Sequence, residues 1–387
     1  MKNLFDNTEV AFSIKSDSEL ERAYFLFKMI QNQPMVRIGT AVTNFALKAK
    51  LPVEGLIRAT VFDHFCGGTN EEDCLPSIEK LYTKGVSSVL DYSVEGKEEE
   101  SEFNDTVTKI LKIINFGQER KSIPFAVFKP TGFGRFAIFQ KVTEKIALTV
   151  TEEAEWQRVI VRFHTVCKAA FKNNVPLLID AEESWMQGAA DTLIEEMMET
   201  YNKEKAIIFN TLQMYRHDRL DYLKVLTEKA NQKGFHIGMK VVRGAYMEKE
   251  RYRAKEKGYS SPICADKQAT DLNYDSAIIF MMEQPNMALF AGTHNEESTY
   301  LLMDLAKKHN ISKEDNRLWF GQLYGMSDNI SFNLSEVGYN VAKYLPFGPV
   351  RDVMPYLIRR AEENTSVAGQ TSRELNLIGA ERKRRKV

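Results

Sequence analysis

The run Pro176-Leu177-Leu178-Ile179-Asp180-Ala181-Glu182-Glu183 shows the pattern that decides the fold. A short apolar segment ends in carboxylates, as a strand does when both its faces are buried and its carboxyl end reaches solvent. Runs of this kind recur from Val86 onward and alternate with segments of helical period. Eight of them are found: Ser87–Val94, Pro124–Lys129, Pro176–Glu182, Ala206–Tyr215, His236–Tyr246, Met287–His294, Leu318–Tyr324 and Val341–Pro346.

Helical patterns separate these runs, and eight apolar strands alternating with helices predict an α/β fold, a (β/α)8 TIM-like barrel. The intervening helices are expected at Glu153–Asn173, Ala189–Asn202, Asp218–Gln232 and Glu296–His309, and Pro355–Asn364 would be the eighth. A doubly wound sheet is the alternative, but no GxGxxG motif follows any of the strands.

The first part of the chain has a different character. Helices are predicted at Ser16–Met29, Val36–Lys48 and Val53–Phe65. The expected organisation is therefore an N-terminal helical arm or cap (residues 1–85), a catalytic barrel (86–375) and a basic C-terminal tail (376–387).

Composition excludes several classes of protein. The chain has 387 residues, of which 43% are hydrophobic and 27% charged, and its net charge is −1, which argues against a general nucleic-acid binder. The basic run Arg382–Lys386 is interpreted as a solvated terminus. Cys66, Cys74, Cys167 and Cys264 show no CxxC pairing and are expected to be reduced thiols in a cytosolic protein. No signal-peptide pattern and no apolar run of about 20 residues is present, so membrane insertion is not expected, while peripheral contact stays open.

Polar residues gather where the predicted strands end. In a barrel the carboxyl ends of the strands form the active-site face, so we expect these residues to line one cavity. They are Lys129, Asp180, Gln213, Lys240, Tyr246, Thr293, His294, Asn295, Gln322 and Tyr344. No second histidine stands at metal-ligand spacing from His294, so no metal site is predicted.

A helix near the C-terminus carries two adjacent arginines. In Pro355–Asn364, helical spacing puts Tyr356, Arg359, Arg360 and Glu363 on one face. Neighbouring guanidinium groups repel each other unless an anion neutralises them, and they bind carboxylates bidentately. This face is suited to a small carboxylic acid. The alternative is a solvated helix in which Arg359 pairs with Glu363.

Taken together, these segments resemble the proline dehydrogenase family over nearly the whole chain, from Phe5 to Asn364. The most specific pieces are Ile179–Glu183, Lys240–Arg251 and Tyr356–Glu363, in matching order and spacing. The resemblance implies a distorted (β/α)8 barrel with FAD at the carboxyl ends of the strands and the eighth helix over the flavin. Lys240 stands where many bifunctional bacterial members carry arginine.

The resemblance also implies roles for individual residues. Lys129, Arg359 and Arg360 would hold the proline carboxylate, and Asp180 would fix the geometry of that cluster. Tyr246, Tyr344 and Tyr356 would enclose the pyrrolidine ring, with Tyr344 excluding a ring hydroxyl. Asp180 and Lys240 would be the catalytic residues. The FAD-binding positions would be Ala181, Gln213, Lys240, Val242, Gly244, Ala245, Thr293, His294, Asn295 and Glu363.

The implied activity is oxidation of L-proline to Δ1-pyrroline-5-carboxylate by hydride transfer to FAD, the first step of proline catabolism. Electrons would pass to a membrane quinone, and a separate Δ1-pyrroline-5-carboxylate dehydrogenase would act next. The aldehyde dehydrogenase module of the bifunctional relatives and the DNA-binding segment of some others are not expected here. We therefore expect a cytoplasmic protein with peripheral contact at the inner face of the membrane.

Two other functions are weighed against this one. A Schiff-base aldolase also uses a barrel with lysines such as Lys129 and Lys240 at strand ends. It leaves the arginine helix and the pattern of Gln213 with His294 unexplained. A non-catalytic regulator would bind nucleic acid through residues 381–387, and that binding would be sensitive to salt.

Overall fold

The computed structural model describes residues 3–32, 54–93, 96–366 and 370–387, together with residues 34, 36, 39 and 41. The predicted helix Val36–Lys48 falls almost wholly outside them. The chain forms two compact units, Met1–Glu95 with Gln322–Val387, and Gly96–Gly321. The predicted division into arm, barrel and tail stays a prediction.

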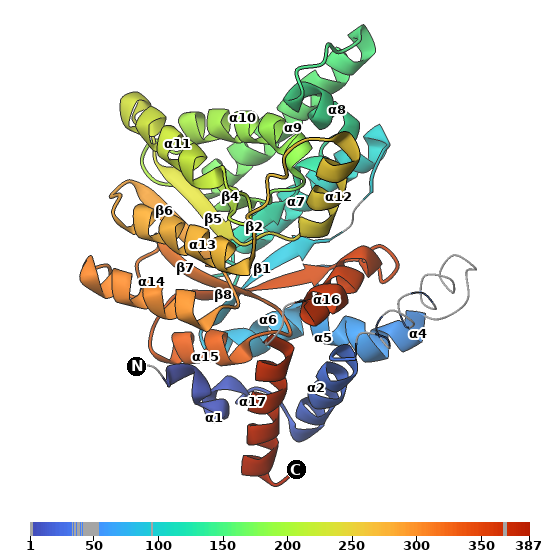
Figure 1. Ribbon diagram of the computed structural model, residues 1–387, viewed down its shortest axis with the longest axis vertical. Helices are drawn as coiled ribbons and strands as arrows, with labels where there is room; N and C mark the ends of the chain where they lie inside the picture. The colour runs from blue at the N-terminus through green and yellow to red at the C-terminus, as the bar shows by residue number, and fades with distance from the viewer. Residues whose placement is uncertain are drawn as a thin grey trace. The chain divides into compact units, whose positions relative to one another are not determined.

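Eight parallel strands form a closed barrel in chain order, which confirms the predicted (β/α)8 fold (Figure 1). Each strand overlaps its predicted run. In the second unit, Phe128 pairs with Ile179 and Gln213 with Val242, so the carboxyl ends of neighbouring strands lie side by side. The strands are β1 (Val86–Tyr92), β2 (Phe125–Phe128), β3 (Leu177–Ile179), β4 (Ile208–Gln213), β5 (Ile237–Val242), β6 (Met287–Gly292), β7 (Leu318–Leu323) and β8 (Val341–Phe347).

The four helices predicted at Glu153–Asn173, Ala189–Asn202, Asp218–Gln232 and Glu296–His309 all overlap helices of the second unit. Thr149 begins α9 with a capping box, because its side chain accepts from the backbone N–H of Glu152 while the Glu152 carboxylate accepts from the N–H of Thr149. Asn174 ends that helix in the left-handed conformation. The helices are α7 (Glu100–Gln118), η3 (Pro130–Gly132), α8 (Phe136–Thr143), α9 (Val150–Asn173), α10 (Ser184–Tyr201), α11 (Arg219–Lys233), α12 (Met247–Lys257), α13 (Lys267–Met282) and α14 (Glu296–Lys308).

An aromatic cluster fills the core of the second unit. The ring of Phe125 on β2 meets those of Phe209, Phe290 and Trp319 edge to face, with centroids 5.2–5.8 Å apart. Such pairs contribute about 0.5–1.5 kcal/mol each beyond area burial. Because these rings come from β2, β4, β6 and β7, they hold four strands around one packed centre.

The helices of the first unit include one irregular segment. Ser16 and Glu19 form the capping box that begins α2, as the predicted helix Ser16–Met29 requires. The helix expected at Val53–Phe65 is interrupted by a π-helical turn, η2. The elements are η1 (Leu4–Asp6), α1 (Thr8–Ala11), α2 (Asp17–Ile30), α4 (Glu54–Ile57), η2 (Arg58–Phe62), α5 (Asp63–Phe65), α6 (Leu75–Tyr82), α15 (Asp328–Glu336), α16 (Met354–Ser366) and α17 (Gln370–Arg385).

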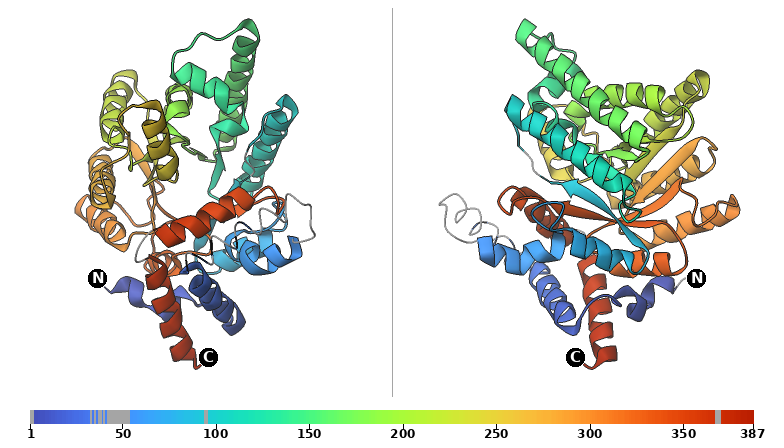
Figure 2. Two further views of the ribbon diagram at one scale, coloured as in Figure 1. Left: turned by 45° about the vertical axis from the view of Figure 1, so that its right-hand side comes forward. Right: turned by 180° about the vertical axis from the view of Figure 1, so that it is seen from behind.

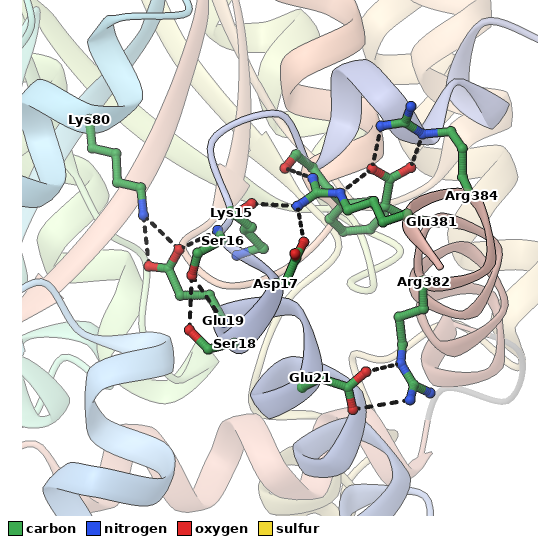
Figure 3. Close-up of polar contacts among 12 residues, drawn as sticks. Lys15, Ser16, Asp17, Ser18, Glu19, Glu21, Lys80, Glu381, Arg382 and Arg384 are labelled. Atoms are coloured by element: carbon green, nitrogen blue, oxygen red, sulfur yellow. Dashed lines mark hydrogen bonds and ion pairs between the residues drawn. The ribbon is translucent and has the colours of Figure 1, made fainter. Parts of the chain in front are cut away.

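The basic C-terminal run forms the last turns of α17, which passes between α1 and α2 (Figures 1 and 2). Its arginines meet carboxylates: Arg382 pairs with Glu21 of α2, and Glu381 accepts from Arg384 and Arg385 at 2.7–2.9 Å (Figure 3). The expectation of a solvated terminus is therefore wrong for Arg382 and Arg385, which are half-buried, whereas Lys383, Arg384 and Lys386 are exposed as expected. Long-range pairing with acids of α2 cannot be deduced from a local run of basic residues.

Neither a membrane-spanning helix nor a metal-binding cluster is found among the residues that the structure describes. None of their helices combines the length and apolarity needed to cross a bilayer. They also contain no cluster of three His, Cys, Asp or Glu side chains placed to bind a metal ion.

Candidate active site

A largely buried ion pair lies toward the carboxyl ends of β3 and β5 in the second unit. The Lys240 Nζ is 2.5 Å from the Asp180 Oδ1, and the two side chains are 7% and 16% exposed. Asp180 directly follows β3, and its backbone N–H donates to the carbonyl of Phe128 at 2.9 Å. A buried ammonium group requires a compensating negative charge, which Asp180 provides. Asp180 had been expected in a cluster with Lys129 and the two arginines, so its ion pair with Lys240 is an additional contact.

Lys129 follows β2 and begins the short turn η3. Two positions later, Thr131 is bound by Glu182, which lies just beyond β3. The backbone N–H and the hydroxyl of Thr131 donate to the two carboxylate oxygens at 3.0 and 2.7 Å. Burial outweighs the Thr131 hydrogen bonds and the charge of Lys129, which lower the pKa of Glu182, and the net result is a pKa raised to about 7. Glu182 was not among the predicted site residues.

The carboxyl ends of β4 and β5 lie side by side, with Gln213 paired to Val242. Gln213 ends β4 and is 3% exposed, and its Oε1 is a buried atom with no hydrogen-bond partner in the described structure. Gly244 has a φ of 127°, and a Cβ there would lie 2.5 Å from the ring of Tyr215. Only glycine fits this position. Val242 ends β5, and Ala245 is exposed beyond it.

Arg243 connects β5 to the segment after β6. Its guanidinium donates to Asp271, to the Thr293 hydroxyl at 2.7 Å and to the Ser298 hydroxyl at 2.9 Å. The Asn295 backbone N–H donates to the same Thr293 oxygen, while the Asn295 side chain accepts from Ser298 and begins α14. Sequence reasoning missed Arg243 although it lies within the Lys240–Tyr246 motif. His294, between Thr293 and Asn295, is half-buried.

Tyr246 stands immediately before α12, half-buried, with the Lys249 ammonium 5.8 Å from its ring centre. The next turn of α12 is attached to α10. The fully buried Glu250 carboxylate accepts from the backbone N–H and the hydroxyl of Ser184, both at 2.6 Å. Lys249 pairs with Glu183 at 2.6 Å. These contacts fix the start of α12 and with it Tyr246.

The remaining predicted residues belong to the first unit. Tyr344 lies in β8 and is 8% exposed, and its carbonyl accepts from the Tyr324 N–H at 2.8 Å. Tyr356 is buried in α16, and the Arg360 guanidinium lies 5.3 Å from its ring centre, one turn further on. Arg359 is half-buried. The predicted shared face is therefore present for Tyr356 and Arg360, and the side chain of Glu363 lies outside the described ones.

The structure thus brings together Asp180 with Lys240, and Tyr356 with Arg360. The three-cation cluster has Lys129 in one unit and both arginines in the other, so that cluster stays a prediction. Ala181 is half-buried. It lies between Asp180, which pairs with Lys240, and Glu182, which accepts from Thr131.

Comparison with known proteins gives a consistent result. The proline dehydrogenase family model matches residues 74–373. The carbapenem antibiotics biosynthesis protein CarD of Pectobacterium carotovorum subsp. carotovorum is 35% identical over 353 residues, covering 91% of this chain and 92% of that protein. The mitochondrial proline dehydrogenase 1 of Arabidopsis thaliana is 30% identical over 425 residues, covering 97% and 85%.

Solved structures share the fold. Proline utilization A of Bdellovibrio bacteriovorus matches with a TM-score of 0.72 and 22% identity over 95% of this chain and 37% of its own. The Bradyrhizobium japonicum counterpart, a D778Y mutant, has a TM-score of 0.65 and 19% identity, covering 81% and 31%. The chain therefore spans about a third of the length of these larger proteins.

Proposed function

Because the chain belongs to the proline dehydrogenase family and is an oxidoreductase acting on proline, we propose that it oxidises L-proline to Δ1-pyrroline-5-carboxylate with FAD as cofactor. The observation that carries this proposal is the buried Lys240–Asp180 pair at the active-site face of the barrel. A protein keeps such a pair in place of apolar packing at a stability cost, which favours a role in the chemistry.

The residues present fit a flavin. Gln213 offers a buried amide oxygen without a partner among the described residues, and Lys240 offers a cation on the neighbouring strand, two residues before the Val242 that pairs with Gln213. The proposed contacts are those at Ala181, Gln213, Lys240, Val242, Gly244, Ala245, Thr293, His294, Asn295 and Glu363. Bound FAD would supply the hydride acceptor, and the protein would supply orientation and electrostatics.

The protein's own residues would hold the substrate by its carboxylate. In this proposal Lys129, Arg359 and Arg360 bind that group, which leaves the ring carbon on the far side of the nitrogen free to react. The amine must be neutral to donate its electron pair, and surrounding cations favour the neutral form. Tyr246, Tyr344 and Tyr356 would enclose the ring.

The proposal extends to the electron acceptor and the next enzyme. A membrane quinone would receive the electrons, which implies peripheral contact with a membrane, and a separate Δ1-pyrroline-5-carboxylate dehydrogenase would consume the product. Flotation with liposomes at low salt tests the membrane contact. Failure to float would contradict it.

One spectrum tests the central proposal. Purified protein should show flavin absorbance that bleaches on anaerobic addition of L-proline. A colourless protein whose lysine is trapped by borohydride with a carbonyl substrate would support the aldolase instead. The ion pair of Lys240 weighs against that alternative, because Schiff-base formation needs a neutral amine.

Substitution of the arginines tests the carboxylate contact. Arg359→Met and Arg360→Met should each raise KM for L-proline about ten- to a hundredfold, because a charge-assisted hydrogen bond contributes about 1.5–3 kcal/mol. FAD content should stay unchanged. Arg351→Met is the matched control, since Arg351 lies just before α16 and pairs with Glu54. An unchanged KM in both variants would refute the assignment.

A further inference from the structure

We propose that Glu182 is a positioning residue that holds the turn carrying Lys129, so that the Lys129 ammonium can bind a substrate carboxylate. This inference rests on the proposed function. It assigns to Glu182 no contact with substrate or cofactor, and it depends only on contacts within the second unit.

The first argument is geometric. Both carboxylate oxygens of Glu182 are used by one residue, Thr131, whose backbone N–H and hydroxyl donate at 3.0 and 2.7 Å. Thr131 lies in the single turn η3, and Lys129 is the residue that begins this turn. A turn this short has few internal hydrogen bonds. An external acceptor that holds two of its donors therefore fixes its orientation.

The second argument is that Glu182 is itself held in place. Its backbone N–H donates to the Gln187 Oε1 at 2.9 Å, and the Gln187 amide donates to Asp191 at 2.9 Å. Asp191 pairs with Arg219 of α11, also at 2.9 Å. The side chains of these four residues, Glu182, Gln187, Asp191 and Arg219, are all buried. The chain of contacts thus anchors the Lys129 turn to α10 and α11.

The third argument concerns charge. The charged groups facing Glu182 are Lys129 and the adjacent Glu183. Lys129 lowers the pKa of Glu182, whereas burial and Glu183 raise it. A negative charge beside Lys129 opposes the binding of another carboxylate. The hydrogen bonds of Glu182 to Thr131 therefore favour binding of a substrate carboxylate at Lys129, whereas its negative charge opposes that binding. Removing the charge alone and removing the whole side chain should thus change the dissociation constant differently.

The experiment uses the FAD-loaded full chain and measures the dissociation constant of tetrahydrofuran-2-carboxylate, a ring acid without an oxidisable amine. Binding is followed by the change in flavin absorbance at pH 6 to 8. The variants are Glu182→Ala, Glu182→Gln and Thr131→Val. Thr143→Val is the matched control, because Thr143 makes two similar hydrogen bonds, both to α10 (to Met186 and Ala189, 2.9 Å each).

Glu182→Ala and Thr131→Val should weaken binding about tenfold, as expected for lost hydrogen bonds to a buried group, with KM for proline rising more than kcat falls. Thr143→Val should bind as the wild type does. Glu182→Gln keeps an acceptor for the Thr131 N–H and gains a donor for the Thr131 hydroxyl oxygen. This variant should therefore bind tetrahydrofuran-2-carboxylate at least as tightly as the wild type does. Wild-type binding should weaken as pH rises through about 7, where Glu182 ionises, and Glu182→Gln should lose this dependence.

Equal binding by Glu182→Ala and wild type would overturn the proposal, as would equal losses in Thr131→Val and Thr143→Val. If Glu182→Ala does not fold, the comparison of Thr131→Val with Thr143→Val decides, because Thr131→Val removes one of the two hydrogen bonds to Glu182: wild-type affinity in Thr131→Val refutes the role. Failure of the proposed function is a separate result, because the wild type itself would then show no flavin bleaching with L-proline.

Discussion

At the scale of single residues, Tyr344 offers a test of substrate choice. Its side chain is almost wholly buried in β8, and it is proposed to exclude a hydroxyl group from the ring of the substrate. Tyr344→Ser should raise kcat/KM for hydroxyproline relative to proline, since removing the ring opens space for a polar substituent. Tyr344→Phe keeps the ring and is the control. A preference ratio that does not change in Tyr344→Ser would remove Tyr344 from the proposed wall.

The sequence allowed the site residues to be identified, but it did not show which of them pair with each other. Lys240 and Asp180 were both identified because they stand near or just beyond the carboxyl ends of apolar strands. Their ion pair joins positions 60 residues apart, and no local pattern selects Asp180 over Glu182 or Glu183 as the partner. Arg243 and Glu182 were overlooked for the same reason, although acids and cations directly after buried strands are the signal that could have identified them.

At the scale of elements, the attachment of α12 to α10 is open to a direct test. Glu250→Ala removes the acceptor of the Ser184 N–H and hydroxyl, and an unsatisfied buried donor costs about 1–3 kcal/mol. Amide hydrogen exchange in Met247–Lys257 should become faster in this variant. The control is Glu248→Ala, on the exposed face of the same helix. Unchanged exchange in Glu250→Ala would show that other contacts hold α12.

The strands were predictable because each is a short apolar run that a parallel barrel buries on both faces. Helix α2 was predictable from its apolar stripe, and Ser16 and Glu19 form the capping box at its start. The π-helical turn η2 was not, because it interrupts a segment whose residues suit an ordinary helix. The environment of Arg382 was also hidden, since its partner Glu21 lies 361 positions away.

At the scale of the whole molecule, a buried charge network in the first unit links distant parts of the chain. Asp328 at the start of α15 pairs with Lys15 at 3.1 Å and with the fully buried Lys343 of β8 at 2.8 Å. Glu374 of α17 accepts from the Ser327 backbone N–H. Burial and, to a smaller extent, the charge of Asp328 together raise the pKa of Glu374 to about 7.

This network predicts how stability depends on pH. The folded pKa of Glu374 lies above its unfolded value, so folding is favoured where the folded form keeps its proton, and stability falls as pH rises from about 4.5 through 7. One pKa unit corresponds to about 1.4 kcal/mol, so the shift from 4.5 to about 7 corresponds to a loss of about 3 to 4 kcal/mol at most. The difference in unfolding free energy between wild type and Glu374→Gln, measured by urea titration, should therefore shift in favour of the variant from pH 5 to 8. A difference independent of pH would contradict the assignment.

The packing of α17 against α2 has a consequence for synthesis of the protein. Leu377 and Ile378 share one apolar cluster with Phe12, Leu20 and Phe27. While the ribosome makes the hundreds of residues in between, at about 5–20 residues per second, the nascent α2 lacks these partners for tens of seconds. During that interval its apolar face is available to chaperones, and a stalled or prematurely ended polypeptide would keep it uncovered.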